Sequence, residues 1–385
     1  MNTAMRIAAI VLALGFGFEA HGEGGRTLEE LKAETQARAD RNAYPLIGLK
    51  PGDAREALAR LTSRDRDEWA ASWSGIGDRY MAKGDFRQAW LTYSFARWPV
   101  PNSRGKQRAY EKALAAYLAY ARRYDPPLEV LRVPYEGSEV RGYLRVPKGA
   151  RAAPLIVAIA GLDSRKEEMV ERFAPLAERG VAVLALDSPG TGESGVTAQP
   201  GVEASLTRMI DAALAHGGID AKRIAVYGGS FGGYWAAILA VTERERLRAV
   251  VAQSPPVHDY FSKARTLSLA SNREYLFDYV EAHQFTYGAA TIEELAERKE
   301  RMSLVARGYL ARPMAPMLVI AGVLDTQVPI ADIDLLMRGG DTPKEIWVHP
   351  RGGHMGRDSA AWPDPVIFRR VTAPWLLNAL EVEPR

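Results

Sequence analysis

Residues 224–233 read IAVYGGSFGG, an apolar run followed at once by glycines that flank a single serine, Ser230. This is the G-x-S-x-G pattern of a nucleophile elbow, in which a serine occupies a tight turn between a strand and a helix. The turn strains the serine backbone and needs small neighbours on both sides, which Gly228, Gly232 and Gly233 supply. Because short glycine–serine strings also arise by chance, the motif alone is weak and needs partners elsewhere in the chain.

Two downstream loops supply the partners that a serine nucleophile requires. A serine hydroxyl needs an adjacent general base, and the base needs a carboxylate that fixes its tautomer. His354 lies in the glycine-rich run at 352–356, and Asp325 follows an apolar strand pattern at 317–320. The chain order Ser, Asp, His is that of the α/β-hydrolases. The sequence therefore predicts a serine hydrolase in which Ser230 is the nucleophile, His354 the base and Asp325 the orienting acid.

Other histidines and aspartates fit these roles less well. His349 falls at the end of a strand pattern and precedes a proline, so we expect it to be packed. Asp332 and Asp334 fall in the following helix and are typical of charges at a helix start. His258 and His283 belong to a later insertion, where their only expected role is contact with substrate.

Acyl transfer also needs two backbone N–H groups that bind the oxyanion. We predict the amide of Phe231, next to the nucleophile, and the amide of Leu162, in the Gly-Leu-Asp-Ser loop at 161–164. That loop lacks a His-Gly-Gly-Gly string, so the lipase form of the oxyanion hole is not indicated. Ser164 has the spacing of a capping box with Glu167, and we assign it capping rather than catalysis.

Composition excludes several other functions. The 385 residues are 47% hydrophobic and 25% charged with a net charge of +3, and the charges are interspersed, which disfavours a nucleic-acid partner. The absence of cysteine excludes thiolate catalysis and cysteine metal sites. His349 and His354 do not share a helix face, and the glycine loop at 187–194 lacks a following Gly-Lys-Ser/Thr. We therefore expect no metal and no cofactor, and a small-molecule ester or acyl substrate.

The N-terminus resembles a targeting segment. Arg6 precedes a twelve-residue apolar run at 7–18, which small residues follow. This arrangement is typical of a signal peptide, which we assign to residues 1–22. The apolar run is shorter than a transmembrane helix requires. We expect export to the periplasm or medium without a stable membrane anchor; a cytoplasmic location is the alternative.

Residues 23–125 have the pattern of a helical domain. Aromatic and alanine positions recur three and four residues apart in three segments: 69–80, 85–98 and 105–124. Tyr117, Tyr120 and Tyr124 illustrate the spacing. Such a stripe is typical of core packing, and a platform for a ligand is the alternative.

After the proline pair at 126–127, strand and helix patterns alternate. A hairpin at 128–134 and 139–146 precedes six apolar strand patterns, at 155–160, 181–186, 224–226, 247–252, 317–320 and 346–348. Helical patterns separate most of them, at 167–179, at 202–216 and from Ser230 onward. Residues 126–385 are therefore expected to form a mostly parallel sheet with helices on both faces, the α/β-hydrolase fold. A helical insertion at 258–312, amphipathic over 292–310, is placed to form a lid over the serine.

Together these motifs resemble one branch of the α/β-hydrolases, the FrsA-like esterase and dihydropseudooxynicotine hydrolase-like family. Four stretches carry the resemblance: 161–168, 187–193, the elbow at Ser230, and Gly352-Gly353-His354. The helical segment before the hydrolase core is also similar. The resemblance implies hydrolysis of a carboxylic ester through an acyl-serine intermediate, or cleavage of a carbon–carbon bond in a β-diketone-like substrate. A non-catalytic interaction protein on the same scaffold is disfavoured, because all three residues of the Ser-Asp-His set are present.

Overall fold

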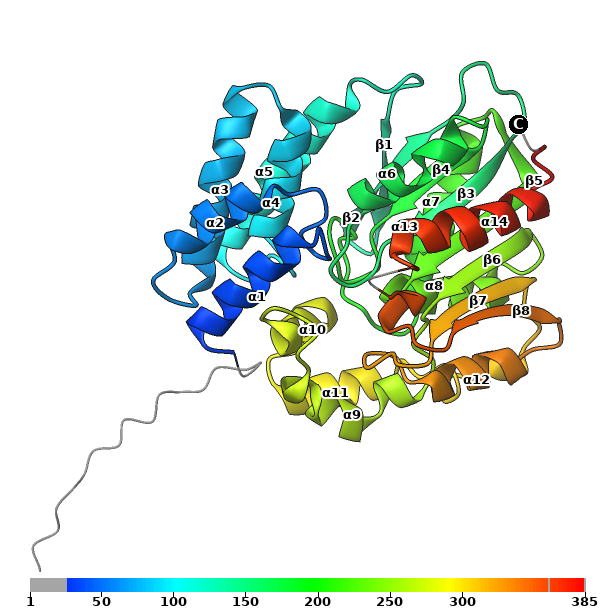
Figure 1. Ribbon diagram of the computed structural model, residues 1–385. Helices are drawn as coiled ribbons and strands as arrows, with labels where there is room; N and C mark the ends of the chain where they lie inside the picture. The colour runs from blue at the N-terminus through cyan, green and yellow to red at the C-terminus, as the bar shows by residue number, and fades with distance from the viewer. Residues whose placement is uncertain (1–25, 359–360, 384–385) are drawn as a thin grey trace, which may run out of the picture.

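A single eight-stranded sheet forms the centre of the computed structural model, which describes residues 26–358 and 361–383 (Figure 1). The strand order is β1-β2-β4-β3-β5-β6-β7-β8; β1 and β2 are antiparallel to their neighbours, and β3 to β8 run parallel. The strands are β1 (Glu129–Tyr135), β2 (Ser138–Arg145), β3 (Ala153–Ile159), β4 (Ala182–Leu186), β5 (Ile219–Gly229), β6 (Leu247–Gln253), β7 (Met317–Gly322) and β8 (Lys344–His349). Every predicted strand overlaps an observed one, so the α/β-hydrolase fold is confirmed. The signal peptide predicted at 1–22 lies outside the described residues.

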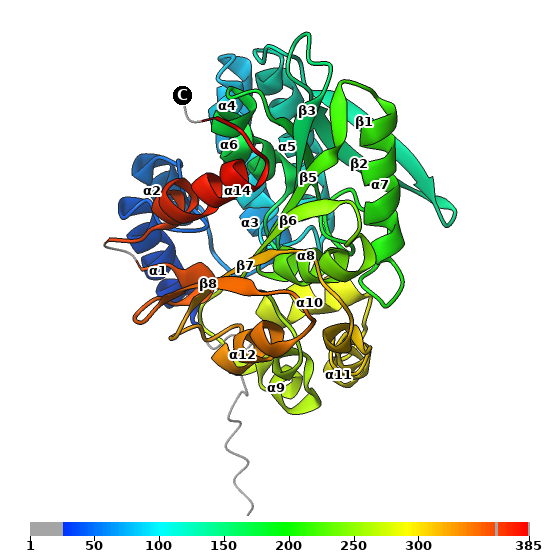
Figure 2. The ribbon, with the colours of Figure 1, turned by 90° about the vertical axis from the view of Figure 1, so that its right-hand side faces the viewer.

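Helices cover both faces of the sheet, because successive side chains of a buried strand point to opposite faces. In β3, Leu155 and Val157 pack in a cluster with α7 and α8, whereas Ile156 and Ala158 pack in a second cluster with α6 and α14. Figure 2 shows α7 and α8 on one side of the strands and α6 and α14 on the other. The helices of this region are α6 (Lys166–Ala177), α7 (Glu203–Ala215), α8 (Phe231–Thr242), α12 (Ile330–Arg338), α13 (Asp364–Ile367) and α14 (Ala373–Ala379). Both faces are buried, which explains why the central strands are apolar throughout rather than alternating.

The N-terminal helices form a bundle beside the antiparallel edge of the sheet (Figure 1). They are α1 (Leu28–Asp40), α2 (Pro51–Ala59), α3 (Arg66–Ala82), α4 (Phe86–Ala96) and α5 (Arg104–Ala121). The predicted aromatic stripe packs against the sheet: Tyr117 is buried and stacks on Tyr143 of β2, with 5.8 Å between ring centroids. The half-buried Tyr120 and Tyr124 direct their hydroxyls at Glu171 on α6. The stripe is therefore core packing at Tyr117, and the bundle shares its hydrophobic core with the sheet.

The insertion between β6 and β7 contains α9 (Lys263–Leu267), α10 (Tyr279–Tyr287) and α11 (Ile292–Glu300). The amphipathic helical stretch expected over 292–310 is helical only as far as Glu300, where α11 ends and turns follow. Asp278 ties the insertion to the bundle: its buried carboxylate accepts hydrogen bonds from Lys106 Nζ at 2.7 Å and Arg66 Nε at 2.9 Å. Among the described residues, no helix is both long and apolar enough to cross a membrane.

Candidate active site

Ser230 occupies the turn between β5 and α8 in a strained backbone conformation, with φ 55° and ψ −122°. A non-glycine residue in this region costs about 1–3 kcal/mol. The turn brings backbones so close that a Cβ at Gly228 would lie 2.0 Å from the Gly232 carbonyl oxygen. A Cβ at Gly232 would lie 2.4 Å from the Ile159 carbonyl oxygen on β3. The turn thus requires the small residues that the motif predicted, and it projects the serine side chain beyond the carboxyl end of the sheet.

The structure brings Ser230, His354 and Asp325 together in one hydrogen-bonded chain. His354 Nε2 lies 2.9 Å from Ser230 Oγ, and His354 Nδ1 lies 2.9 Å from Asp325 Oδ2. Ser230 follows β5, Asp325 follows β7 and His354 follows β8, so the parallel strands bring all three to one edge of the sheet. The imidazole and the carboxylate are 7% and 3% exposed, which shields their interaction from water. With Nδ1–H donating to the carboxylate, Nε2 is free to accept the serine proton.

Asp325 is held as a carboxylate by its surroundings. Burial alone would raise its pKa, but the neighbouring His354 and hydrogen-bond donors outweigh burial and lower the pKa below its ordinary value. The N–H groups of Gln327 and Val328 each donate to Oδ1 at 2.9 Å. The group facing the imidazole is therefore ionised and fixed in orientation.

The histidine loop is held from within the sheet by residues that sequence reasoning missed. Gln253, the last residue of β6, donates through Nε2 to the Met355 carbonyl oxygen at 2.8 Å, and the Met355 N–H donates to Ser254 Oγ at 3.0 Å. Tyr227 of β5 in turn donates to Gln253 Oε1 at 2.8 Å. The available signal was a glutamine at the end of an otherwise apolar strand. These contacts fix the residue next to His354 and so place the imidazole.

The loop predicted to contribute Leu162 runs beside Ser230. A Cβ at Gly161 would lie 3.6 Å from Ser230 Cβ. Among the described residues, neither the Leu162 N–H nor the Phe231 N–H donates to another protein group. Both amides are thus available to a ligand, and their role in an oxyanion hole stays a prediction.

The predicted capping box of Ser164 and Glu167 is wrong. Helix α6 begins at Lys166, so its N-cap is Arg165, and the carboxylate that accepts the Arg165 N–H, at 3.1 Å, belongs to Glu168. Ser164 Oγ instead accepts the Gly161 N–H at 2.7 Å and closes the loop. Glu167 is turned away toward the buried Lys166 ammonium, 3.0 Å from it.

The N-terminal bundle holds this loop through a buried guanidinium. Arg97 follows α4, is 2% exposed, and donates through Nη1 to the Asp163 carbonyl oxygen at 2.8 Å. The adjacent Trp98 donates through Nε1 to Asp163 Oδ2 at 3.2 Å. On the other side, Arg165 Nη1 donates to the Leu162 carbonyl oxygen at 3.1 Å. The peptide groups around Leu162 are therefore oriented by side chains from two different parts of the chain.

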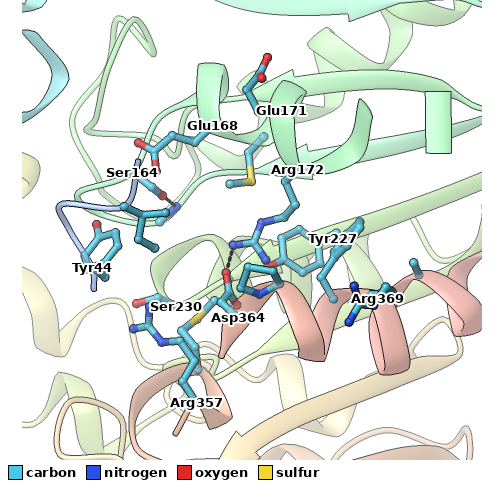
Figure 3. Close-up of a pocket in the computed structure, with 18 of the residues that line it drawn as sticks. Tyr44, Ser164, Glu168, Glu171, Arg172, Tyr227, Ser230, Arg357, Asp364 and Arg369 are labelled. Carbon is cyan, nitrogen blue, oxygen red and sulfur yellow. Dashed lines mark hydrogen bonds and ion pairs between the residues drawn. The ribbon is translucent and has the colours of Figure 1, made fainter. Parts of the chain in front are cut away.

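Ser230 and His354 open into a cavity of about 1060 Å³, the reactive cavity, which runs between α6 and the C-terminal helices (Figure 3). Apolar side chains form much of its wall, among them Met169, Leu176, Tyr227, Phe368 and Leu377. An ion pair between Arg172 and Asp364 crosses one side of it (Figure 3). Glu168 faces the cavity, and burial raises the pKa of its carboxyl to about 7 against the opposing effect of nearby Arg97. The cavity accommodates a sizeable, mainly apolar molecule.

The remaining candidates serve structural roles. His349 is packed in the protein, as predicted: it is buried, and its Nε2 lies 2.9 Å from Asp358 Oδ2. His258 and His283 are not among the described residues that line the reactive cavity, so the expected substrate contact is not found there. Asp332 is more than a helix-start charge: its buried carboxylate accepts the N–H groups of residues 257–260 and fixes the turn after β6. Within residues 26–358 and 361–383, no group of three or more His, Asp or Glu side chains is placed to hold a metal ion.

Comparison with known proteins places this site in a family context. A family model described as "Esterase FrsA-like" matches residues 76–345. Esterase FrsA of Vibrio cholerae serotype O1 is 27% identical over 335 residues, which cover 77% of this chain and 79% of the relative. The α/β hydrolase ucsC of Acremonium sp. is 26% identical over 264 residues, with 57% of this chain and 53% of the relative covered.

Two solved structures share the fold. Wild-type AbyA5 superposes with a TM-score of 0.75 at 23% identity, covering 94% of this chain and 96% of that protein. The 2,6-dihydroxy-pseudo-oxynicotine hydrolase superposes with a TM-score of 0.70 at 22% identity, covering 88% and 95%. Both alignments extend over most of the chain, so the N-terminal bundle is part of the shared fold.

Replacing Arg97 with methionine should slow the reaction of Ser230 with a fluorophosphonate by about tenfold or more. The substitution frees the Asp163 carbonyl and lets the neighbouring amides drift, and small misplacements in an active site are costly. The measurement is the rate of covalent labelling, and the control is Arg122→Met, the same change at the exposed residue that follows α5. Equal labelling rates in the two variants would show that the bundle does not position the loop.

Replacing Glu168 with glutamine should change how stability depends on pH. The pKa of Glu168 is about 7 in the folded protein, compared with an ordinary value of 4.5, so the folded state holds an extra proton between these pH values. The free energy of unfolding of the wild type should therefore fall, relative to the variant, as pH rises from about 4.5 to above 7. Urea unfolding at several pH values measures this, with the exposed Glu29→Gln as control. A constant difference between wild type and Glu168→Gln across this range would contradict the assignment.

Proposed function

This chain belongs to the FrsA-like esterase family and is a hydrolase of the α/β class, and from that premise we propose that it cleaves a carboxylic ester through an acyl-serine intermediate. The observation that supports this most strongly is the chain of two 2.9 Å contacts that joins Ser230 Oγ to His354 and His354 to Asp325. A nucleophile, a base and an orienting acid at these distances have the geometry of acyl transfer.

In the proposed first half-reaction, Ser230 Oγ attacks the ester carbonyl carbon while His354 Nε2 takes the serine proton. The ionised Asp325 stabilises the imidazolium and keeps Nδ1 protonated. The carbonyl oxygen becomes an oxyanion, which the amides of Leu162 and Phe231 bind. Collapse of the tetrahedral intermediate expels the alcohol, which receives the proton from His354, and leaves the acyl group on Ser230.

In the second half-reaction a water molecule takes the place of the alcohol. His354 removes a proton from the water, whose oxygen attacks the acyl-serine carbonyl carbon, and the same amides bind the second oxyanion. The carboxylate product leaves as Ser230 recovers its proton. An alkoxide leaving group needs only the proton that His354 carries, whereas the carbanion produced by carbon–carbon cleavage must also be stabilised as it forms. Ester hydrolysis is therefore the reaction that needs the fewest groups beyond Ser230, His354, Asp325 and the two amides.

We propose further that two regions outside the sheet select the substrate: the helical domain at 23–125 and the insertion at 258–312, which serves as a lid. Tyr44 and Trp98 from the first and Tyr275 from the second line the reactive cavity. Because these side chains meet over one cavity, its shape depends on how the two regions pack. For location we propose export, on the basis of the leader pattern at 1–22; N-terminal sequencing of the protein recovered from the periplasm decides this.

Ser230→Ala should abolish both fluorophosphonate labelling and hydrolysis of p-nitrophenyl esters, with kcat falling by about 10⁴-fold or more. Ser205→Ala on α7, a buried serine outside the reactive cavity, is the matched control and should retain both. Wild-type protein that is not labelled would overturn the enzyme assignment and favour a non-catalytic role. Labelling with turnover of β-diketones but not of esters would replace ester hydrolysis by carbon–carbon cleavage.

A further inference from the structure

A second cavity of about 670 Å³ adjoins the reactive one on the side of the insertion. Side chains from α1, α9 and α11 and from the loop after β7 line it. The two cavities share Arg38, Glu274 and Gln327 in their walls. Glu274 and Gln327 are hydrogen-bonded to each other, Nε2 to Oε2 at 2.6 Å, so this pair stands between the two spaces. The proposed ester chemistry uses none of the other residues of the second cavity.

One side chain in the wall of this second cavity, Lys299, is buried without a hydrogen-bond partner among the described residues. It lies on α11, its side chain is fully buried, and among the described residues Nζ has no hydrogen-bond partner. The ammonium lies 4.1 Å from the centroid of the Tyr260 ring, which offers only a weak cation–π contact. Burial, together with nearby Arg265, lowers the pKa of Lys299 to about 7. Burying an amine without a hydrogen-bond acceptor costs free energy of folding. We therefore infer that the acceptor for Lys299 is a ligand.

The wall carries an excess of positive charge. Its basic residues are Arg26, Arg38, Arg265, Arg273 and Lys299, and its acidic residues are Glu34 and Glu274. Both acids already have partners: Glu34 pairs with Arg38 at 2.7 Å, and Glu274 accepts from Gln327. The cavity therefore favours an anion and disfavours a metal ion or an amine.

A second donor faces the same space. Tyr279, at the start of α10, lines the cavity, and among the described residues its hydroxyl forms no hydrogen bond with another protein group. The arginines of the wall already have partners: Arg26 and Arg265 donate to backbone carbonyls, Arg38 pairs with Glu34, and Arg273 also has an interaction within the protein. Among the described residues, the Lys299 ammonium and the Tyr279 phenol remain as donors for a ligand, and together they supply one positive charge. This set matches the single charge and two oxygens of a carboxylate better than a phosphate dianion, which calls for more cationic donors.

We propose that this second cavity binds a small organic carboxylate, whose oxygens accept hydrogen bonds from Lys299 Nζ and the Tyr279 hydroxyl. The volume lies within the range of small-molecule sites. The site adjoins the Asp325 loop, since the Gln327 N–H that donates to Asp325 Oδ1 belongs to a residue of the shared wall. The carboxylate is either the far end of a substrate that reaches Ser230 or a separate small molecule. Binding itself does not depend on the proposed hydrolysis.

The test is calorimetric titration of the full chain with linear dicarboxylates of three to six carbons and with benzoate. Glutaramide serves as the neutral comparator and inorganic phosphate as the competing anion. Lys299→Met should weaken the Kd of the best carboxylate by tenfold or more. Lys263→Met, the same change at an exposed lysine on α9, should leave that Kd unchanged. Tyr279→Phe removes only the hydroxyl and should weaken binding several-fold, so the proposal stays testable if Lys299→Met does not fold.

The proposal is overturned if no carboxylate of the panel binds the wild type, if Lys299→Met and Tyr279→Phe both bind as tightly as Lys263→Met, or if phosphate binds more tightly than every carboxylate. Repeating the titration in Ser230→Ala separates this result from the proposed hydrolysis, because binding should persist there. Competition kinetics against a neutral p-nitrophenyl ester then identify the source. An increase in KM alone supports the far end of a substrate, and a change in kcat at constant KM supports a separate molecule; both outcomes require the site.

Discussion

The close approach of three backbones at the elbow is the constraint on which the rest of the structure depends. Gly228 has no room for a Cβ because the Gly232 backbone of the same turn lies against it, and Gly232 has none because the turn packs against the end of β3. The Ser230 N–H also donates to the Gln253 carbonyl oxygen at 2.7 Å, which joins the turn to β6. A backbone held this closely cannot relax its strained φ without moving both neighbouring strands. Ser230 is therefore positioned by the centre of the sheet, the most buried part of the molecule.

The same parallel sheet brings Asp325 and His354, which form the hydrogen-bonded set with Ser230, to the serine. Asp325 and His354 follow β7 and β8, whose carboxyl ends lie at the edge where β5 ends. The sheet determines only where these loops begin, and side chains determine where they go. Gln253 and Ser254 hold Met355 beside the histidine, and two amides hold the carboxylate. The contacts of Met355 are anchored at the end of β6, and those of Asp325 lie within its own loop, so both loops are held in place before substrate enters.

Buried charges connect the regions outside the sheet. Arg97 of the N-terminal bundle donates a hydrogen bond to the loop beside Ser230. Asp278 of the insertion accepts one from Lys106 of the same bundle. Burying a charge is tolerated where partners satisfy it, and removal of one partner is then severely destabilising. These contacts make the bundle and the insertion act on the shape of one cavity. Lys299 differs from them because no hydrogen-bond partner for its ammonium is found within residues 26–358 and 361–383, which is why we infer a ligand there.

The sequence by itself determined the alternation of strands and helices in the hydrolase domain, and it predicted that Ser230, Asp325 and His354 lie together. These features have local signatures: apolar runs bury both faces of a parallel strand, and glycines mark a turn without room for side chains. The tertiary structure alone decided the partners of Gln253, the role of Ser164, the end of α11 at Glu300 and the position of Arg97. The contact of Ser164 with Gly161 is local, and it became clear only once the start of α6 was known. The others depend on which surface a residue meets after the elements pack, and their contacts join residues as many as 102 positions apart, as between Gln253 and Met355. A hydrogen bond across that separation leaves no periodicity or motif in the chain, so only the folded arrangement reveals it.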